Sequence, residues 1–264
     1  NITGLGTAVE NGGIMQKLTV MLYRIAFCKV QRIFFQNTEN MKFFADRKIA
    51  QTKYSLLPGS GVNLKKFTYC EYPKGETTEF AFISRIMREK GIEQFLDAAE
   101  FIKGKYPNTI FHVCGFCEQE YDTKLRELDK RGIIVYHGMV TDVRGVISNV
   151  HCIVHPTYYP EGLSNVLLEA SACGRPIITT DRSGCREVID DGKNGYICKQ
   201  RDSGDLILQL EKFLMISWDK RRDMGIYGRE KAEREFDRQI VVKKYCDELE
   251  LINDSRERKE VLNI

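Results

Sequence analysis

The chain has 264 residues, of which 42% are hydrophobic and 29% are charged. These fractions are close to globular averages and exclude disordered and collagen-like proteins. The formal net charge is only +3, with 40 Lys and Arg against 37 Asp and Glu, so the chain lacks the strongly basic character of nucleic-acid-binding proteins and we expect no nucleic-acid partner.

The nine cysteines are scattered singly along the chain. An odd number without regular spacing argues against a secreted disulfide scaffold and favours a reducing cytoplasm. No stretch reaches about 18 uncharged apolar residues, so a membrane-spanning helix is not expected. We therefore expect a cytoplasmic protein that is at most peripheral on the inner face of the cell membrane.

The first 55 residues begin with a long apolar stretch. Within residues 14–35, apolar side chains recur at roughly helical spacing and are interrupted by Lys and Arg, which indicates a basic amphipathic helix. Such a helix would suit an anionic membrane surface, and packing inside its own domain is at least as good an interpretation. A strand at 32–37, a helix at 39–47 and a strand at 54–57 are then expected, followed by a Pro- and Gly-rich linker at 56–62.

From residue 80 onward, short apolar strands alternate with helices. This alternation predicts βαβ units and a parallel sheet covered on both faces, which is a Rossmann-like α/β domain. The expected strands are 80–83, 109–114, 133–136, 152–155, 176–180 and 195–198, and the expected helices are 92–103, 120–130, 140–148, 165–173, 203–216 and 229–251. In such a sheet ligands bind beyond the carboxyl ends of the strands, so the loops there are where chemistry is expected.

Two of these loops carry unusual residues. Arg85 and Lys90 follow the strand at 80–83 and could clamp a diphosphate, the first as a planar fork and the second as a point charge. A solvated basic turn explains the same pair equally well.

The loop after the strand at 152–155 runs from Pro156 into a helix at 165–173. Gly162 permits close backbone approach, and the helix N-terminus offers free N–H groups to an anion. Glu161 and Glu169 could each accept hydrogen bonds from a sugar or ribose diol. From spacing alone, an ordinary capped helix with two exposed glutamates remains equally possible.

Taken together, these loops resemble the donor-domain motifs of the family-4 retaining glycosyltransferases, which have the GT-B fold. The resemblance covers roughly residues 55–250, and the flanked Glu-x7-Glu element is its most specific part. The motifs are Arg85-x4-Lys90-Gly91, Glu161-Gly162-Leu163-Ser164-Asn165-x3-Glu169-Ala170, Gly174-x-Pro176 and Glu187-x4-Gly192-x2-Gly195.

The resemblance implies a role for each matching residue. Arg85 and Lys90 would hold the donor diphosphate and stabilise the charge of the leaving nucleotide, and Glu161 would bind hydroxyls of the transferred sugar; these three form the catalytic set. Glu169 would bind the ribose diol, and the turn near Val140 would contact the base through its main chain. Backbone amides and the adjoining side chain would complete the donor site at Gly162, Leu163, Ser164 and Asn165.

No metal or other cofactor is expected, because in the family the Arg/Lys pair and the helix end take the place of a metal. The Cys114-x2-Cys117 spacing resembles half of a zinc site, but no second pair completes four ligands. The co-substrate would be a nucleotide-sugar, with UDP-hexose or UDP-N-acetylhexosamine favoured. The acceptor would be lipid-linked or a polysaccharide, as in bacterial members of the family, and transfer would retain the anomeric configuration.

The resemblance also implies a division of the chain. Residues 1–55 correspond to the last section of an acceptor domain, residues 56–228 to the Rossmann-like nucleotide-sugar domain, and residues 229–264 to a helix returning toward the acceptor domain. The opening strands of the acceptor domain have no counterpart here, so catalysis by this piece alone is doubtful. A non-catalytic nucleotide-sugar binding fragment and another GT-B activity, such as a UDP-sugar epimerase, are the alternatives.

Overall fold

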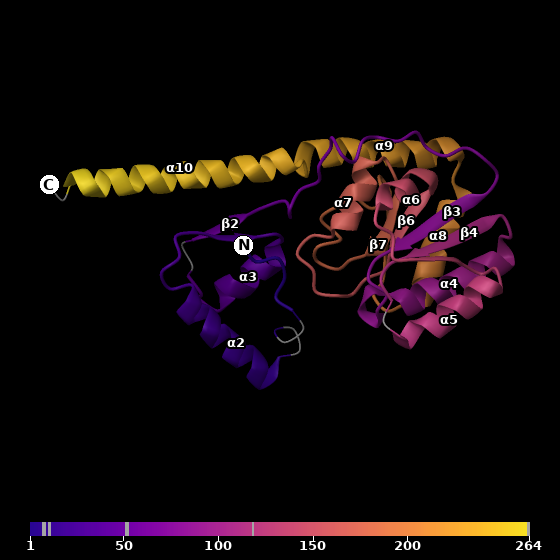
Figure 1. Cartoon of the computed structure of the whole chain (residues 1–264), viewed down its shortest axis with the longest axis horizontal. Helices are drawn as coiled ribbons and strands as arrows, with labels where there is room; N and C mark the ends of the chain where they lie inside the picture. Colours follow the sequence, from indigo (N-terminus) through magenta and orange to yellow (C-terminus); the bar gives the residue numbers. More distant parts are fainter. Residues whose placement is uncertain (7–8, 10–11, 51–52, 118, 263–264) are drawn as a thin grey trace.

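The chain folds into two units of unequal size that are joined by two adjacent crossings and by a long C-terminal helix (Figure 1). The computed structural model describes residues 1–6, 9, 12–50, 53–117 and 119–262. The larger unit is an α/β domain built around a six-stranded sheet, and the smaller unit is formed by the first residues of the chain.

The six strands of the larger unit are parallel and follow the order β5-β4-β3-β6-β7-β8. The chain builds outward from β3 to β5, then returns to the other side of β3 as β6. The carboxyl ends of β3 and β6 therefore form the switch point at which open α/β sheets bind ligands. The strands are β3 (Thr78–Ile83), β4 (Thr109–Cys114), β5 (Val135–Gly138), β6 (Cys152–His155), β7 (Ile177–Thr180) and β8 (Gly195–Cys198).

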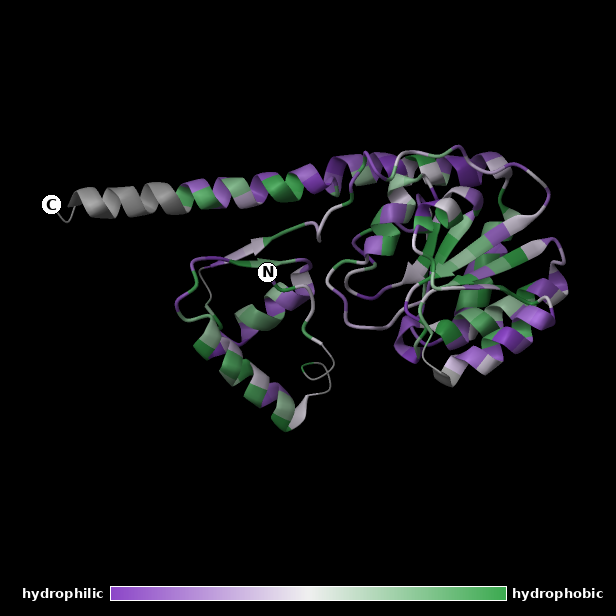
Figure 2. Cartoon of the chain, viewed as in Figure 1, coloured by the Kyte–Doolittle hydropathy of each residue, from purple (hydrophilic) through white to green (hydrophobic). Residues whose placement is uncertain are grey.

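The central strands β3, β6 and β7 are largely buried on both faces and are mostly apolar, and Figure 2 colours much of the sheet green. In β3, Phe80 and Phe82 point into one core cluster and Ala81 and Ile83 into the other. Helices α4 (Ile92–Lys105), α5 (Gln119–Lys130) and α8 (Ser203–Met215) cover the first face, and α6 (Val143–Asn149), α7 (Asn165–Ala172) and α9 (Trp218–Glu235) contribute to the second.

The smaller unit has a two-stranded parallel sheet, β1 (Ile33–Phe35) with β2 (Tyr54–Leu56), and two helices, α2 (Gly13–Ala26) and α3 (Thr38–Asp46). Its core is small and aromatic, with Phe35 against Phe44 in an edge-to-face contact at 4.9 Å. Asn37 begins α3 because its side chain accepts a hydrogen bond from the Asn40 N–H at 2.8 Å.

The two crossings between the units are hydrogen-bonded to each other. The Val62 N–H donates to the Phe236 carbonyl at 2.8 Å, and the Arg238 N–H donates to the Val62 carbonyl at 3.0 Å. Gly61 has a φ of +65° and a Cβ there would lie 2.6 Å from the Cα of Arg238, so only glycine fits this approach.

The C-terminal helix α10 (Arg238–Leu262) then packs on the sheet of the smaller unit. The Tyr245 ring contacts the Phe34 ring at 4.8 Å, and Glu248 pairs with Arg32 at 2.8 Å. The last helix of the chain therefore belongs to the packing of its first strands.

The structure has the strands and helices expected between residues 80 and 198, but it differs at both ends of the chain. The amphipathic helix predicted within 14–35 ends at Ala26, before β1. The tail helix predicted at 229–251 is two helices, because α9 already begins at Trp218 and a break at 236–237 separates it from α10. The boundary expected at 228/229 thus falls inside α9. Among the described residues, no helix is both long and apolar enough to cross a membrane.

Candidate functional site

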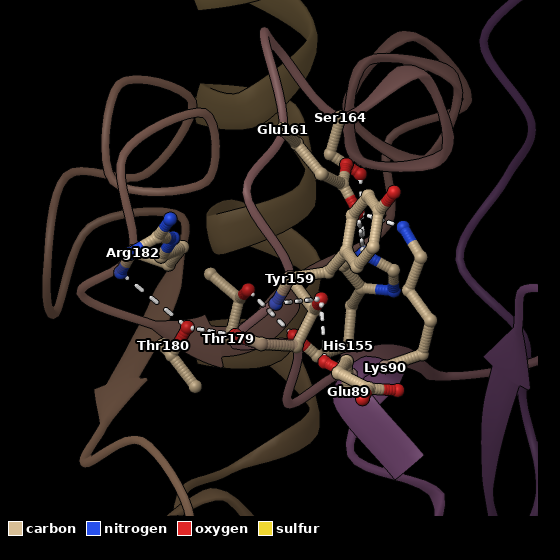
Figure 3. A network of polar contacts seen from close by, with 10 residues as sticks. Glu89, Lys90, His155, Tyr159, Glu161, Ser164, Thr179, Thr180 and Arg182 are labelled. Atoms are coloured by element: carbon tan, nitrogen blue, oxygen red, sulfur yellow. Dashed lines mark hydrogen bonds and ion pairs between the residues drawn. The ribbon is translucent and has the colours of Figure 1, made fainter. Parts of the chain in front are cut away.

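The loops after β3 and β6 meet at the switch point of the sheet. The short 3-10 turn Arg88–Lys90 follows β3, and its Glu89 carbonyl accepts hydrogen bonds from the Tyr158 N–H and the Thr157 hydroxyl. These bonds join the two loops and bring Lys90 into an ion pair with Glu161, in the network of polar contacts shown in Figure 3. Both side chains of the pair are nearly buried, with 11% and 13% exposed.

Glu161 is ionised in this setting. Burial alone would raise the pKa of its carboxyl, but the electrostatic interactions with His155 and with the Lys90 ammonium, which also donates a hydrogen bond, outweigh burial and lower the pKa to about 2. His155 Nε2 lies 3.7 Å from the carboxylate and 3.3 Å from the Ser164 hydroxyl. The carboxylate therefore remains a strong hydrogen-bond acceptor at any physiological pH.

Arg85 and Lys90 share one aromatic partner. Lys90 Nζ lies 4.9 Å and the Arg85 guanidinium carbon 5.8 Å from the centroid of the Tyr159 ring. The Tyr159 backbone is fixed in turn, because its N–H donates to the Thr157 hydroxyl at 3.1 Å. The two cations thus converge on a single point in front of β3 and β6, where they could hold an anion together.

Helix α7 adds a further positive end to the same place. Ser164 occupies the N-cap position of α7, but its hydroxyl contacts His155 and makes no cap hydrogen bond within the described part of the chain. The first N–H groups of α7 are therefore available to an anion. The Ser164 N–H donates to the Gly184 carbonyl at 2.9 Å, and Glu187 holds that loop by accepting from the Gly184 N–H at 2.7 Å.

The loop before α7 is pressed against the smaller unit. A Cβ at Gly162 would lie 2.0 Å from the Thr3 carbonyl oxygen and 2.2 Å from Gln36 Oε1, so no other residue fits there. Asn37 Nδ2 donates to the carbonyls of Glu161 at 3.1 Å and Gly162 at 2.8 Å. The close approach expected of a ligand at Gly162 is made here by the protein's own N-terminal residues.

Between the two units lies a cavity of about 380 Å³. One side is formed by Thr3, Gly4, Gly6, Gln36 and Ser60, and the other by the residues from Tyr159 to Leu163 and by Asn165. Since Glu161 and Asn165, at the start of α7, border this cavity, it has polar residues that a sugar bound next to a phosphate needs.

Glu169 and Val140 do not line this cavity. Burial raises the pKa of the Glu169 carboxyl, while the charges of Lys66 and Arg238 act in the opposite direction. The pKa of Asp142 is lowered mainly by the hydrogen bonds that it accepts from the side chain and the backbone of Arg144. The charge of Lys66 makes a smaller contribution in the same direction. The charge of Lys66 thus acts both on the Glu169 carboxyl and on Asp142, two residues after Val140.

The described residues contain no group of three or more His, Cys, Asp or Glu side chains arranged to hold a metal ion. The positive charge at the switch point comes from Arg85, Lys90 and the end of α7. The chemistry of this site is therefore that of an anion held beside a carboxylate.

Comparison with known proteins identifies the family. Residues 71–231 match the family described as Glycosyl transferases group 1, and this segment is more than half of the chain. The chain belongs to this family. The matched segment contains Arg85, Lys90, Glu161 and Glu169, and the resemblance to family-4 glycosyltransferases is thereby confirmed.

Two bacterial members of the group 1 family illustrate the relationship. The chain is 25% identical over 262 residues to N,N'-diacetylbacillosaminyl-diphospho-undecaprenol alpha-1,3-N-acetylgalactosaminyltransferase of Campylobacter jejuni, covering 92% of this chain and 68% of that protein. It is 26% identical over 231 residues to the capsular polysaccharide biosynthesis glycosyltransferase CapM of Staphylococcus aureus, covering 81% and 60%. The chain therefore spans roughly two thirds or less of these relatives.

Solved structures share the fold of this group 1 chain. Anabaena HepE in complex with UDP and glucose superposes with a TM-score of 0.77 at 16% identity, covering 91% of this chain and 68% of that one. Sucrose-phosphate synthase from Thermosynechococcus elongatus gives 0.77 at 17% identity, covering 96% and 67%. The expected GT-B fold with a Rossmann-like parallel sheet is confirmed.

The structure brings most of the predicted site residues of this glycosyltransferase together. Arg85, Lys90 and Glu161 converge at the switch point, and Gly162, Leu163 and Asn165 line the cavity that Glu161 also borders, whereas Ser164 does not. Sequence reasoning missed His155, Tyr159 and Gln36. His155 ends the buried strand β6 and Tyr159 lies within the predicted loop that follows it, so their positions were an available signal, but Gln36 reaches the site only through tertiary folding.

Proposed function

We propose that this protein transfers a sugar from a nucleotide-diphosphate donor to an acceptor hydroxyl with retention at the anomeric carbon. The observation that carries the proposal is the convergence of Arg85, Lys90 and the start of α7 beside the ionised Glu161. This arrangement provides two cations and free backbone N–H groups for a diphosphate, and a carboxylate for the hydroxyls of the attached sugar.

The residues would act on the two sides of the breaking bond. Lys90 has three N–H groups and uses one for Glu161, so others remain for a phosphate oxygen, and Arg85 offers its planar fork. As the bond between the anomeric carbon and the diphosphate oxygen breaks, these cations stabilise the developing negative charge. The acceptor oxygen bonds to the anomeric carbon on the same face, and its proton passes to the leaving diphosphate.

The nucleoside would lie behind the diphosphate, toward Glu169. The buried carboxylate of Glu169 can accept two hydrogen bonds from a ribose diol, which would repay the cost of its burial. The backbone of the turn at Val140 would contact the base. We propose UDP as the nucleotide and a hexose or N-acetylhexosamine as the sugar, with no metal or other cofactor required.

A lipid-linked or polysaccharide acceptor is proposed from the activities named for the Campylobacter jejuni and Staphylococcus aureus relatives. The apolar face of α2 fits a membrane-bound acceptor, because Ile14, Met21 and Ile25 are 85%, 57% and 61% exposed. Lys17 and Arg24 lie on the same helix, and Figure 2 shows its mixed character. An anionic lipid surface would accept both the apolar and the basic side chains, so we propose that the protein works peripherally on the cytoplasmic face of the membrane.

A thermal-shift panel of UDP-, GDP- and ADP-sugars tests the donor assignment. A ligand that binds only the folded protein raises the unfolding midpoint, so one nucleotide class should stabilise the chain and the others should not. Stabilisation by none of the three would reject the proposal that this site binds a nucleotide-sugar.

Substitution of the two glutamates tests the assignment of the two halves of the donor. We expect Glu169→Ala to weaken binding of free UDP about tenfold, as loss of hydrogen bonds to a charged group would. We expect Glu161→Ala to leave UDP binding nearly unchanged and to abolish discrimination among UDP-sugars. Calorimetric titration with UDP and two UDP-sugars measures both effects. Equal affinities for all ligands in wild type and both variants would contradict the assignment.

A further inference from the structure

The Gln36 side chain is a buried polar group that the structure leaves incomplete. Only 5% of this residue is exposed, yet its Nε2 has no hydrogen-bond partner among the residues that the structure describes. Buried amide groups in folded proteins are almost always hydrogen-bonded, because an unpaired one loses its water without compensation. An unpaired amide at the border of a cavity therefore calls for a partner that the protein itself does not provide.

The position of Gln36 is fixed by its neighbours. It follows β1 directly and precedes Asn37, whose side chain donates to the carbonyls of Glu161 and Gly162. Its Oε1 lies against the Cα of Gly162, where a Cβ could not fit. The amide is thus held beside the loop that contains Glu161, and it lines the same 380 Å³ cavity.

The amide and the carboxylate have complementary hydrogen-bonding chemistry. The ionised Glu161 can only accept hydrogen bonds, whereas the amide of Gln36 can donate as well as accept. A hydroxyl between them could donate to the carboxylate and accept from the amide, so that both of its functions are used. Sugars differ from one another in where such oxygens lie.

We propose that Gln36 is a specificity-determining residue that hydrogen-bonds an oxygen of the transferred sugar. The inference rests on the proposed function and deepens it, since it assigns part of the sugar site to the smaller unit. The buried amide of Gln36 gains its missing hydrogen-bond partner when the sugar is bound. Nucleoside diphosphates without a sugar do not reach this amide.

The test compares nucleotides with and without the sugar. Gln36→Met keeps the length of the side chain and removes the amide. Wild type and variant are titrated by calorimetry with UDP, GDP and ADP, with their glucose conjugates and with UDP-N-acetylglucosamine. The affinity of the variant for the nucleoside diphosphate should equal that of wild type within twofold. Affinity for the preferred nucleotide-sugar should fall about five- to tenfold, as for a lost buried hydrogen bond.

Asn40 offers a matched control in the same segment. Asn40 is also buried, with 9% of the residue exposed, and its Nδ2 likewise has no hydrogen-bond partner in the described part of the chain. Unlike Gln36, it lines a different cavity, together with Leu5 and Phe43. Asn40→Leu should leave the affinities for nucleoside diphosphate and nucleotide-sugar unchanged. Thermal midpoints of both variants at or above that of wild type would show that each is folded.

Each outcome separates the inference from the function on which it rests. If wild type binds none of the nucleotides, the proposed function fails and the inference fails with it. If wild type binds the nucleotide-sugar and Gln36→Met keeps the same ratio of affinities, the inference is overturned and the proposed function stands. An equal fall in both affinities, or the same change in Asn40→Leu, would assign Gln36 a purely structural role and also overturn it.

Discussion

Glu161 and Glu169 flank the same helix start, yet their carboxyl groups have opposite electrostatic surroundings. His155 and Lys90 lower the pKa of Glu161 to about 2, whereas burial raises the pKa of Glu169. Glu161 is therefore held in place by partners within the protein, and Glu169 is left for a partner from outside. This contrast agrees with a sugar contact for the first residue and a ribose contact for the second.

The lowered pKa of Glu161 makes a prediction about stability and pH. A shift from 4.5 to about 2 corresponds to about 3 kcal/mol of stabilisation. It is fully present above pH 4.5 and is lost as the pH falls from 4.5 toward about 2, because the unfolded chain then binds the proton first. We expect Glu161→Gln to lower the free energy of unfolding by about 3 kcal/mol at pH 7.

The difference between wild type and Glu161→Gln should shrink as the pH is lowered through 4.5. Urea denaturation at pH 7, 5, 4 and 3.5 measures this difference. A difference that stays constant over this range would contradict an ionised and paired Glu161.

Glu169 should behave in the opposite way. When the pKa of a carboxyl group is raised in the folded protein, the free energy of unfolding falls as the pH rises through that pKa. The ionised Glu169 therefore destabilises the protein at pH 7. We expect Glu169→Gln to raise the free energy of unfolding by roughly 0.5–1 kcal/mol at pH 7, at the expense of nucleotide affinity. Denaturation at pH 7 without nucleotide is the measurement, and a destabilised variant would show that the carboxylate has a structural partner.

At the scale of secondary-structure elements, one buried arginine joins the turn before β7 to two neighbouring segments. Arg175 is fully buried, and its hydrogen bonds within the described part of the chain go to backbone carbonyls. Its acceptors include the carbonyls of Ile147, Ser148, Cys70 and Glu71, at 2.7–2.9 Å. The guanidinium thus ties the end of α6 and the segment before β3 to the turn that follows α7.

Replacing this arginine should be costly. Lysine cannot reproduce the planar fork, so Arg175→Lys leaves several buried carbonyls unpaired and should destabilise the protein by about 3 kcal/mol or more. Chemical denaturation measures the loss. Arg126→Lys is the control, because Arg126 is exposed and, among the described side chains, pairs with Asp122 on its own helix, and it should change stability by less than about 0.5 kcal/mol. Similar effects of both substitutions would contradict the role of Arg175.

The elements that the sequence predicts correctly are those whose pattern follows from burial alone. The strands β3, β6 and β7 are buried on both faces, so each is a short apolar run between polar loops. The start of α9 was missed, although Ser217 caps it, because that helix is polar along most of its length. The edge strand β5 was placed two residues early, since exposure weakens its apolar pattern.

The candidate site was predictable only in its local part. Arg85, Lys90 and Glu161 lie in loops whose place in the sheet follows from the alternation of elements. The contacts of Gln36 with Gly162 depend on how two units pack, and no spacing along the chain encodes them. Gly162 itself indicated a close approach to its backbone. A glycine there is compatible either with a ligand or with another part of the protein as the close neighbour.

At the scale of the whole molecule, the larger unit provides the charged groups and the smaller unit closes one side of the cavity. Arg186 of the loop after β7 also pairs with Glu39 of α3 at 2.9 Å, which adds a second polar contact beside the Asn37 hydrogen bonds. The cavity between Gln36 and Glu161 therefore exists only while the two units are in contact.

The paired crossings have a mechanical consequence. The chain enters the larger unit beside Val62 and leaves it beside Phe236, and because these two points are hydrogen-bonded they cannot separate independently. α10 moves with the smaller unit through its contact at Tyr245. Rotation about the line through the two crossings is thus the freest relative motion, and sliding is opposed. A ligand would enter between the two units when they rotate apart at the edge opposite the two crossings.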